Sequence, residues 1–134
     1  MIPDRIIEQD TLTTTTSGGG RAAVEVRIPW YRALPASCIA GARLTVDGVE
    51  APAASLRWEL NGRVRTFDDM RDDTEQWWFP LDSAVLSGEL DVAPGVEHEV
   101  GVDLTIYIPY IIIGDDEVLH IEEHDTKTMT AVAA

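Results

Sequence analysis

The sequence predicts an all-β fold, namely an antiparallel two-sheet β-sandwich of immunoglobulin-like or jelly-roll-like type with about eight strands. Apolar and polar residues alternate along several short stretches, and turn-forming pairs separate those stretches. No window of useful length repeats its apolar residues at the spacing of a helix. The length of 134 residues matches one domain, so we expect residues 1–134 to form a single β-sandwich domain.

The first clear strand of the chain covers residues 21–28. Its apolar residues alternate with Ala23, Glu25 and Arg27, as expected when one face of a sheet is buried and the other is solvated. Before this strand, residues 2–9 are compatible with a short edge strand, and a run of threonines leads to three glycines that are typical of a turn.

Two tight hairpins are predicted in the middle of the chain. Asp47-Gly48 and Asn61-Gly62 favour the positive φ angles of a two-residue turn between antiparallel strands. The first pair ends a strand over residues 42–46, and the second joins residues 56–60 to residues 63–67.

The longest regular pattern lies over residues 97–108. His98 and five aliphatic residues share one face, while the other face changes from acidic to apolar along the strand, so its far end needs cover on both sides. Pro109 cannot donate to a sheet ladder and predicts a bulge or bend. Residues 84–92 predict a strand that Gly88 interrupts, and two final strands, at residues 118–121 and 126–132, are expected to close the sheet.

The charge balance excludes two classes of partner. The chain has 24 acidic and 10 basic residues, a formal net charge of -14, which repels phosphate backbones and anionic lipid headgroups. We therefore expect neither nucleic acid nor a membrane surface as a partner. The sequence shows no secretion signal and no run of 18 apolar residues, so we expect a soluble, cytoplasmic protein.

Few residues are candidates for chemistry. Cys38 is the single cysteine and predicts a buried structural thiol, because an internal disulfide needs a second cysteine. His98 has an inward strand position, where an imidazole is more often a satisfied core group than a base. No order of Ser, His and Asp indicates a catalytic triad.

A metal site is the sharpest chemical hypothesis that the residues allow. On a strand, His120, Glu122 and His124 project from one face and could offer two imidazoles and a carboxylate to a divalent metal. The further ligands that jelly-roll metalloenzymes place at set distances are not found here. The favoured alternative is a solvated acidic strand end, so we expect no cofactor in this chain. Residues 68–75 predict a polar loop, and its carboxylates lack the spacing of a calcium loop.

Adjacent large aromatics indicate a protein partner. They occur at Trp30-Tyr31, at residues 77–79 and near the end of residues 106–113. Neighbouring side chains of a strand point to opposite faces, so these residues cannot all fill one core. Aromatic residues and Arg are common anchors of interfaces. The expected contacts are the exposed members of this set: Trp30, Tyr31, Arg32, Trp77, Trp78, Phe79 and Tyr110.

Short motifs spread over almost the whole chain carry a resemblance. They are Ile6-Ile7-Glu8-x-Asp10-Thr11-Leu12, Ile28-Pro29-Trp30-Tyr31-Arg32-Ala33-Leu34-Pro35-x-Ser37-Cys38-Ile39, Leu44-Thr45-Val46-Asp47-Gly48, the Asn61-Gly62 hairpin, Trp77-Trp78-Phe79 and Ile108-Pro109-Tyr110. Together they resemble the small β subunit of bacterial C-glycoside deglycosidases. The Pro-Trp-Tyr-Arg-x-Leu-Pro segment is fairly specific. The segment from His120 to Asp125, in the tail after Ile113, does not map onto the family's pattern.

The resemblance implies a non-catalytic β-sandwich subunit in a hetero-oligomer. Its partner would be a larger TIM-barrel α subunit, similar to sugar isomerases, that carries a divalent metal, usually taken as manganese. The complex would cleave the carbon-carbon bond between a sugar and an aromatic aglycone after another enzyme has oxidised the sugar to its 3-oxo form. A ketone beside C2 acidifies the C2 proton, a metal can stabilise the resulting charge, and the aglycone leaves from C1 by elimination.

Two other functions remain open. A stand-alone carbohydrate-binding β-sandwich module would also expose aromatics, which stack on sugar rings, but such a module is usually attached to a catalytic domain or a secretion signal. A jelly-roll metalloenzyme would use His120, Glu122 and His124.

Overall fold

The computed structural model describes residues 6–15, 20–28, 32–80, 82–114 and 117–134, apart from the side chains of residues 109–118. These residues form twelve strands, one short α-helix and two 3₁₀ turns. The strands belong to sheets of six, four and two strands. The all-β prediction is therefore confirmed, while the twelve strands exceed the expected eight because several have only two or three residues.

The six-stranded sheet has the order β12-β1-β2-β9-β6-β7. Its strands are β1 (Thr13–Thr15), β2 (Arg21–Val26), β6 (Arg57–Leu60), β7 (Arg63–Arg65), β9 (Ala84–Gly88) and β12 (Val132–Ala133). All neighbours are antiparallel except β1 and β12, which run parallel. The prediction of a wholly antiparallel fold is wrong at this edge, where the last residues of the chain pair with the first strand.

The four-stranded sheet has the order β11-β10-β4-β5 and carries the longest strands. Its members are β4 (Ile39–Val46), β5 (Val49–Glu50), β10 (Glu97–Gly114) and β11 (Glu117–Thr130). A separate two-stranded sheet joins β3 (Leu34–Pro35) to β8 (Trp77–Trp78). The remaining elements are α1 (Phe67–Met70), η1 (Ala36–Cys38) and η2 (Ala53–Ser55).

Both predicted hairpin turns are confirmed. Asp47 and Gly48 have φ angles of 53° and 81° between β4 and β5, and Asn61 and Gly62 have 55° and 79° between β6 and β7. Two successive positive φ angles match the twist of antiparallel strands, which is why short polar residues and glycine occupy these positions.

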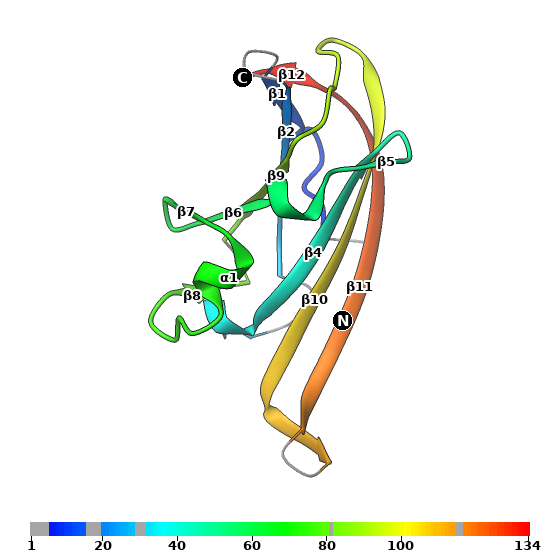
Figure 1. Cartoon of the computed structure of the whole chain (residues 1–134). Helices are drawn as coiled ribbons and strands as arrows, with labels where there is room; N and C mark the ends of the chain where they lie inside the picture. Colours follow the sequence, from blue (N-terminus) through cyan, green and yellow to red (C-terminus); the bar gives the residue numbers. More distant parts are fainter. Residues whose placement is uncertain (1–5, 16–19, 29–31, 81, 115–116) are drawn as a thin grey trace.

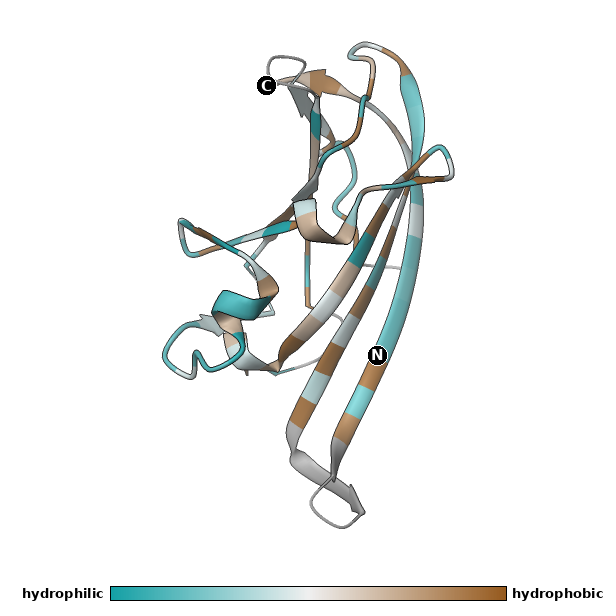
Figure 2. Cartoon of the chain, viewed as in Figure 1, coloured by the Kyte–Doolittle hydropathy of each residue, from teal (hydrophilic) through white to brown (hydrophobic). Residues whose placement is uncertain are grey.

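One hydrophobic core joins the inner faces of the two larger sheets. It includes Val24 and Leu86 from the six-stranded sheet and Leu44, Val102 and Leu104 from the four-stranded sheet. Figure 2 shows the corresponding apolar bands alternating with polar ones along β4 and β10. The period of two that is visible in the sequence therefore identifies the buried face correctly.

The hairpin of β10 and β11 extends beyond the rest of the molecule (Figure 1). Strand β4 pairs with β10 only as far as Ile106, opposite Ile39, and β10 then pairs with β11 alone. We call this two-stranded extension, residues 107–114 and 117–120, the arm. The register of β10 and β11 shifts between Ile108 and Ile112, which confirms the irregularity predicted at Pro109.

Three local predictions differ from the structure. The segment of residues 68–75 begins inside α1, and Thr66 and Asp69 form the capping box of that helix. The helix is a single turn, which is too short for apolar residues to repeat at helical spacing. The two strands expected after residue 117 form one strand, β11, and residues 89–92 do not extend β9. No helix among the described residues has the length and apolar character needed to span a membrane.

Candidate partner interface

Two large aromatic side chains remain exposed beside the two-stranded sheet. Trp77 is 42% exposed and Phe79 is 52% exposed. They flank Trp78, and alternate side chains along extended backbone share a face, so both face away from the core. They are the largest of the exposed hydrophobic side chains among the described residues, which makes them the centre of a candidate interface.

Trp78 belongs to the core of this chain, so its prediction as a partner contact is wrong. The side chain is fully buried. Its indole N–H donates to the Asp82 carbonyl at 3.0 Å, and its ring meets Trp58 edge-on with centroids 5.0 Å apart. The alternation of β8 puts Trp78 on the inner side, where it is opposite Leu34 of β3.

The other predicted contacts have different outcomes. Arg32 is exposed, two residues before β3. Trp30 and Tyr31 lie outside the described residues, as does the side chain of Tyr110. Their role at an interface stays a prediction.

The loop before Trp77 is held in place by one carboxylate. Asp73 forms an ion pair with Arg65 of β7, and both side chains are largely buried. Asp73 Oδ1 also accepts hydrogen bonds from the backbone N–H groups of Glu75 at 2.9 Å and Gln76 at 3.1 Å. The hydrogen bond from Arg65 and these two backbone bonds lower the pKa of Asp73 to about 2.

Two further contacts fasten this loop to its neighbours. The Ala36 N–H donates to the Gln76 carbonyl, and the Ser37 N–H donates to the Asp73 carbonyl, both at 2.8 Å. The Asn61 side chain, in the turn between β6 and β7, donates to Gln76 Oε1 at 3.1 Å. The exposed aromatics thus stand on a backbone that is already ordered, which reduces the entropy lost on binding.

A hollow of about 330 Å³ lies between α1 and the base of the arm. Its walls are Ser37, Ile39, Ala40, Phe67, Asp68, Arg71 and Tyr107. The Ser37 backbone links the hollow to the loop that presents Trp77. In Figure 1, α1, β8 and the arm all lie in the same half of the molecule, and the hollow joins α1 to Tyr107 at the base of the arm.

The histidines proposed for a metal site serve other contacts. His120, Glu122 and His124 are exposed on one face of β11, as predicted. The His120 ring packs on Tyr107 with centroids 4.4 Å apart. His124 Nδ1 lies 2.5 Å from Asp103 and its Nε2 lies 2.9 Å from Thr126 Oγ1.

These contacts leave the metal hypothesis without a complete ligand set. The described residues bring together no group of three His, Cys, Asp or Glu side chains that could hold a metal ion. Both ring nitrogens of His124 already have partners, so the segment does not fit a divalent metal in this structure.

Asp125, in the same segment, was missed by the sequence analysis. Its side chain is buried, and Oδ2 accepts from the Ile7 N–H at 2.8 Å and pairs with Lys127 at 3.0 Å. It therefore fastens the N-terminal segment to β11. The alternation of side chains along β11 could have indicated this burial, because Asp125 is four residues before Met129 and therefore lies on the same inward face.

Cys38 and His98 have the structural roles that the sequence predicts. Cys38 is buried, and burial raises the pKa of its thiol, which disfavours the nucleophilic thiolate. His98 is buried between Asp47 Oδ2, 2.6 Å from Nδ1, and the Ala93 carbonyl, 2.9 Å from Nε2. These two acceptors raise the pKa of His98, because each is best satisfied by an N–H group.

Comparison with known proteins assigns the family. The model of the C-glycoside deglycosidase beta subunit family matches residues 2–110. The chain is also similar to a C-glycoside deglycosidase beta subunit of Microbacterium trichothecenolyticum, with 69% identity over 134 residues and 100% of both chains covered. This chain belongs to the C-glycoside deglycosidase β subunit family.

Two further beta subunits are similar to this chain. One from Arthrobacter globiformis is 67% identical over 130 residues, covering 96% of each chain. A 3'-dehydrocarminate deglycosidase beta subunit of a Microbacterium species is 36% identical over 129 residues, covering 96% of this chain and 95% of the relative.

The C-glycoside deglycosidase β subunit family model ends at the arm. It stops at residue 110 within β10, whereas the first of these relatives aligns with all 134 residues and so includes β11. The segment from His120 to Asp125 therefore lies beyond the match to the family model but within the match to that relative.

Proposed function

We propose that this chain is the non-catalytic β subunit of a C-glycoside deglycosidase, a β-sandwich that stabilises a larger TIM-barrel α subunit in a cytoplasmic hetero-oligomer. The observation that supports an assembly is the exposure of Trp77 and Phe79 in the half of the molecule that also carries the arm. The relatives are named as beta subunits, which accords with a second kind of subunit.

The proposed reaction is an elimination on a 3-oxo-C-glycoside. A base removes the proton at C2, the electron pair forms a double bond between C1 and C2, and the bond from C1 to the aglycone carbon breaks as that carbon takes up a proton. A divalent metal, which we propose to be manganese held by the α subunit, would supply Lewis acidity at the ketone. One relative is named for 3'-dehydrocarminate, and this name supports a substrate oxidised at the 3' position.

The contacts of this chain support a scaffolding role. Two of the three histidines have both ring nitrogens engaged within this chain: His98 bonds Asp47 and Ala93, and His124 bonds Asp103 and Thr126. The Cys38 thiol is buried. We therefore place the base, the acid and the metal on the partner.

The test is to produce the chain together with its proposed α subunit and to weaken the interface. Trp77→Ala and Phe79→Ala should each weaken the complex at least about tenfold, because aromatic side chains at the centre of an interface commonly contribute more than about 1.4 kcal/mol. Size-exclusion chromatography with light scattering measures the complex, and thermal unfolding of the isolated subunit measures its stability.

The matched control is Val49→Ala. Val49 is 61% exposed, but it lies on β5, away from β8, so its truncation should leave the complex intact. Unchanged assembly of both aromatic variants, or an equal loss of complex in the control, would contradict the proposed interface. Sugar binding by the isolated chain would instead favour a carbohydrate-binding module.

A further inference from the structure

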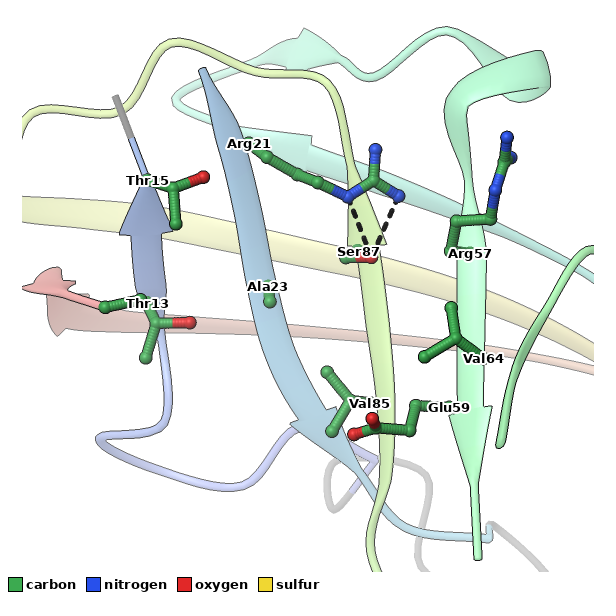
Figure 3. A pocket seen from close by; sticks show the side chains of 10 residues that line it. Thr13, Thr15, Arg21, Ala23, Arg57, Glu59, Val64, Val85 and Ser87 are labelled. Carbon is green, nitrogen blue, oxygen red and sulfur yellow. Dashed lines mark hydrogen bonds between the residues drawn. The ribbon is translucent and has the colours of Figure 1, made fainter. Parts of the chain in front are cut away.

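A second pocket lies on the outer face of the six-stranded sheet, and its lining includes neither Trp77 nor Phe79. It has a volume of about 230 Å³. Figure 3 shows its walls, which are Thr13, Thr15, Arg21, Ala23, Arg57, Glu59, Val64, Val85, Ser87 and Ala134. The pocket is thus built from residues of β1, β2, β9, β6 and β7 on the face opposite the core, together with Ala134 after β12.

Two guanidinium groups mark one end of this pocket. Arg21 is fixed by Ser87 Oγ, which accepts from Nε at 3.2 Å and from Nη2 at 3.0 Å, and by the Ser55 carbonyl at 2.8 Å. Arg57 Nη1 donates to the carbonyls of Ala54 at 3.0 Å and Leu56 at 2.8 Å. Neutral oxygens therefore hold both side chains in place.

Neither arginine forms a direct ion pair within the part of the chain that the structure describes. The ion pairs of that part include neither Arg21 nor Arg57. Burial and the charge of Arg57 lower the pKa of Arg21, and the more weakly acting charge of Glu89 opposes them. In a chain with 24 acidic residues, two fixed cations without a paired carboxylate indicate a place for an external anion.

The rest of the pocket narrows the kind of anion. Ala23, Val85 and Val64 give it an apolar middle, and the Glu59 carboxylate lies at the end opposite the guanidinium groups (Figure 3). Arg57 and Glu59 are two residues apart on one strand, which separates their Cα atoms by about 7 Å. That spacing suits a ligand with a carboxylate at one end, a flat apolar body and a hydrogen-bond donor at the other.

We propose that this pocket binds a small hydroxyaryl carboxylate. Its carboxylate would accept from Arg21 Nη1 and from Arg57 Nε and Nη2, which donate to no other described residue. Its ring lies on the apolar middle, and its hydroxyl donates to Glu59. The net charge of the chain opposes this binding weakly, because salt screens charges beyond about 8 Å at physiological ionic strength.

The experiment titrates 4-hydroxybenzoate into the full chain and follows binding by calorimetry. We expect saturable binding to one site, weakened at least about tenfold in Arg21→Gln and in Arg57→Gln through the loss of a charge-assisted contact. Arg57→Lys keeps the charge and should retain more affinity than Arg57→Gln. The matched control is Arg43→Gln, because Arg43 lies on β4 and pairs with Glu50 at 3.5 Å.

A second comparison tests the far end of the pocket. The wild-type chain should prefer 4-hydroxybenzoate to benzoate, and Glu59→Gln should reduce that preference. Absence of saturable binding, or an equal loss of affinity in the Arg43 and Arg57 variants, would overturn the proposal. Neither result bears on the β subunit assignment, because assembly with the α subunit is measured separately.

Discussion

At the scale of single residues, position within a strand decides what each aromatic can do. Trp77 and Trp78 are identical in chemistry and adjacent in sequence, yet one is 42% exposed and the other is fully buried. The alternation of extended backbone separates them. The sequence alone predicts that some of these aromatics face outward, but which of them does so depends on the pairing of β8 with β3.

His98 and Asp47 form the clearest pH-sensitive contact. The folded state raises the pKa of His98, so this contact stabilises the protein fully below the ordinary pKa of 6.5 and the stabilisation is lost as the pH rises through the higher folded value. Asp47 has a lowered pKa, mainly through its hydrogen bond to His98, and its contribution is present above 3.8 and lost as the pH falls below the folded value. The contribution of His98 is complete only below pH 6.5, and that of Asp47 only above pH 3.8. Both are therefore complete only at the mildly acidic pH values between these limits.

We predict that His98→Leu destabilises the chain more at pH 5.5 than at pH 9. At pH 5.5 the imidazolium satisfies both Asp47 and Ala93, so its loss should lower the free energy of unfolding by about 2 kcal/mol. At pH 9 the neutral ring has one N–H, and the loss should be smaller. Urea unfolding at both pH values measures this. His120→Leu is the control, and an equal effect of His98→Leu at the two pH values would contradict the charged contact.

At the scale of elements, the short loop from α1 to β8 is ordered by a few polar contacts. The capping box of Thr66 and Asp69 begins the helix, and Asp73 then fixes the chain that leads to Trp77. The composition of residues 68–75 predicts only a polar loop. Among the carboxylates of this segment, Asp73 is the one that forms an ion pair with Arg65 of β7.

We predict that Asp73→Asn lowers the free energy of unfolding by about 2 kcal/mol, because it leaves the largely buried Arg65 without its counter-charge. The lowered pKa of Asp73, about 2, means that this stabilisation is present above pH 3.8 and is lost as the pH falls toward 2. Denaturant unfolding between pH 2 and 7 measures both effects.

Asp68→Asn is the matched control for this prediction. Asp68 also pairs with an arginine, Arg71, but the two side chains are 82% and 73% exposed. Exposed pairs contribute less than about 1 kcal/mol. If the two variants lost equal stability, burial of the Arg65 pair would not explain its effect.

At the scale of the whole molecule, the arm is the feature whose stability is hardest to explain from the contacts of this chain alone. A two-stranded hairpin is marginally stable in water by itself, and the arm has no third strand after β4 ends. Its strand β10 includes the sequence Ile-Pro-Tyr-Ile-Ile-Ile, and β11 carries apolar bands near the same end (Figure 2). A partner that covers the arm would supply the missing packing.

We predict that a shortened arm weakens assembly while the body stays folded. Replacing residues 109–118 with an Asn-Gly turn joins Ile108 to Leu119, which are already paired. The core residues of β10 up to Ile108 are retained, so the melting temperature of the isolated chain should change by less than about 5 °C. The affinity for the α subunit should fall at least tenfold, as measured by light scattering. Full assembly of the shortened chain would place the interface elsewhere.

The sequence by itself determined the β class, the two hairpin turns, the buried face of β10, the irregularity after Ile108 and the family. These follow from patterns within a few residues, where the period of two and the φ angles of Asn-Gly and Asp-Gly pairs act directly. The tertiary structure alone decided that Trp78 is a core residue, that Asp73 meets Arg65, that β12 pairs in parallel with β1, and that Arg21 and Arg57 share a pocket. Each of those depends on how separate segments meet in the folded chain, and outside the tight hairpins no local pattern specifies which strands will be neighbours.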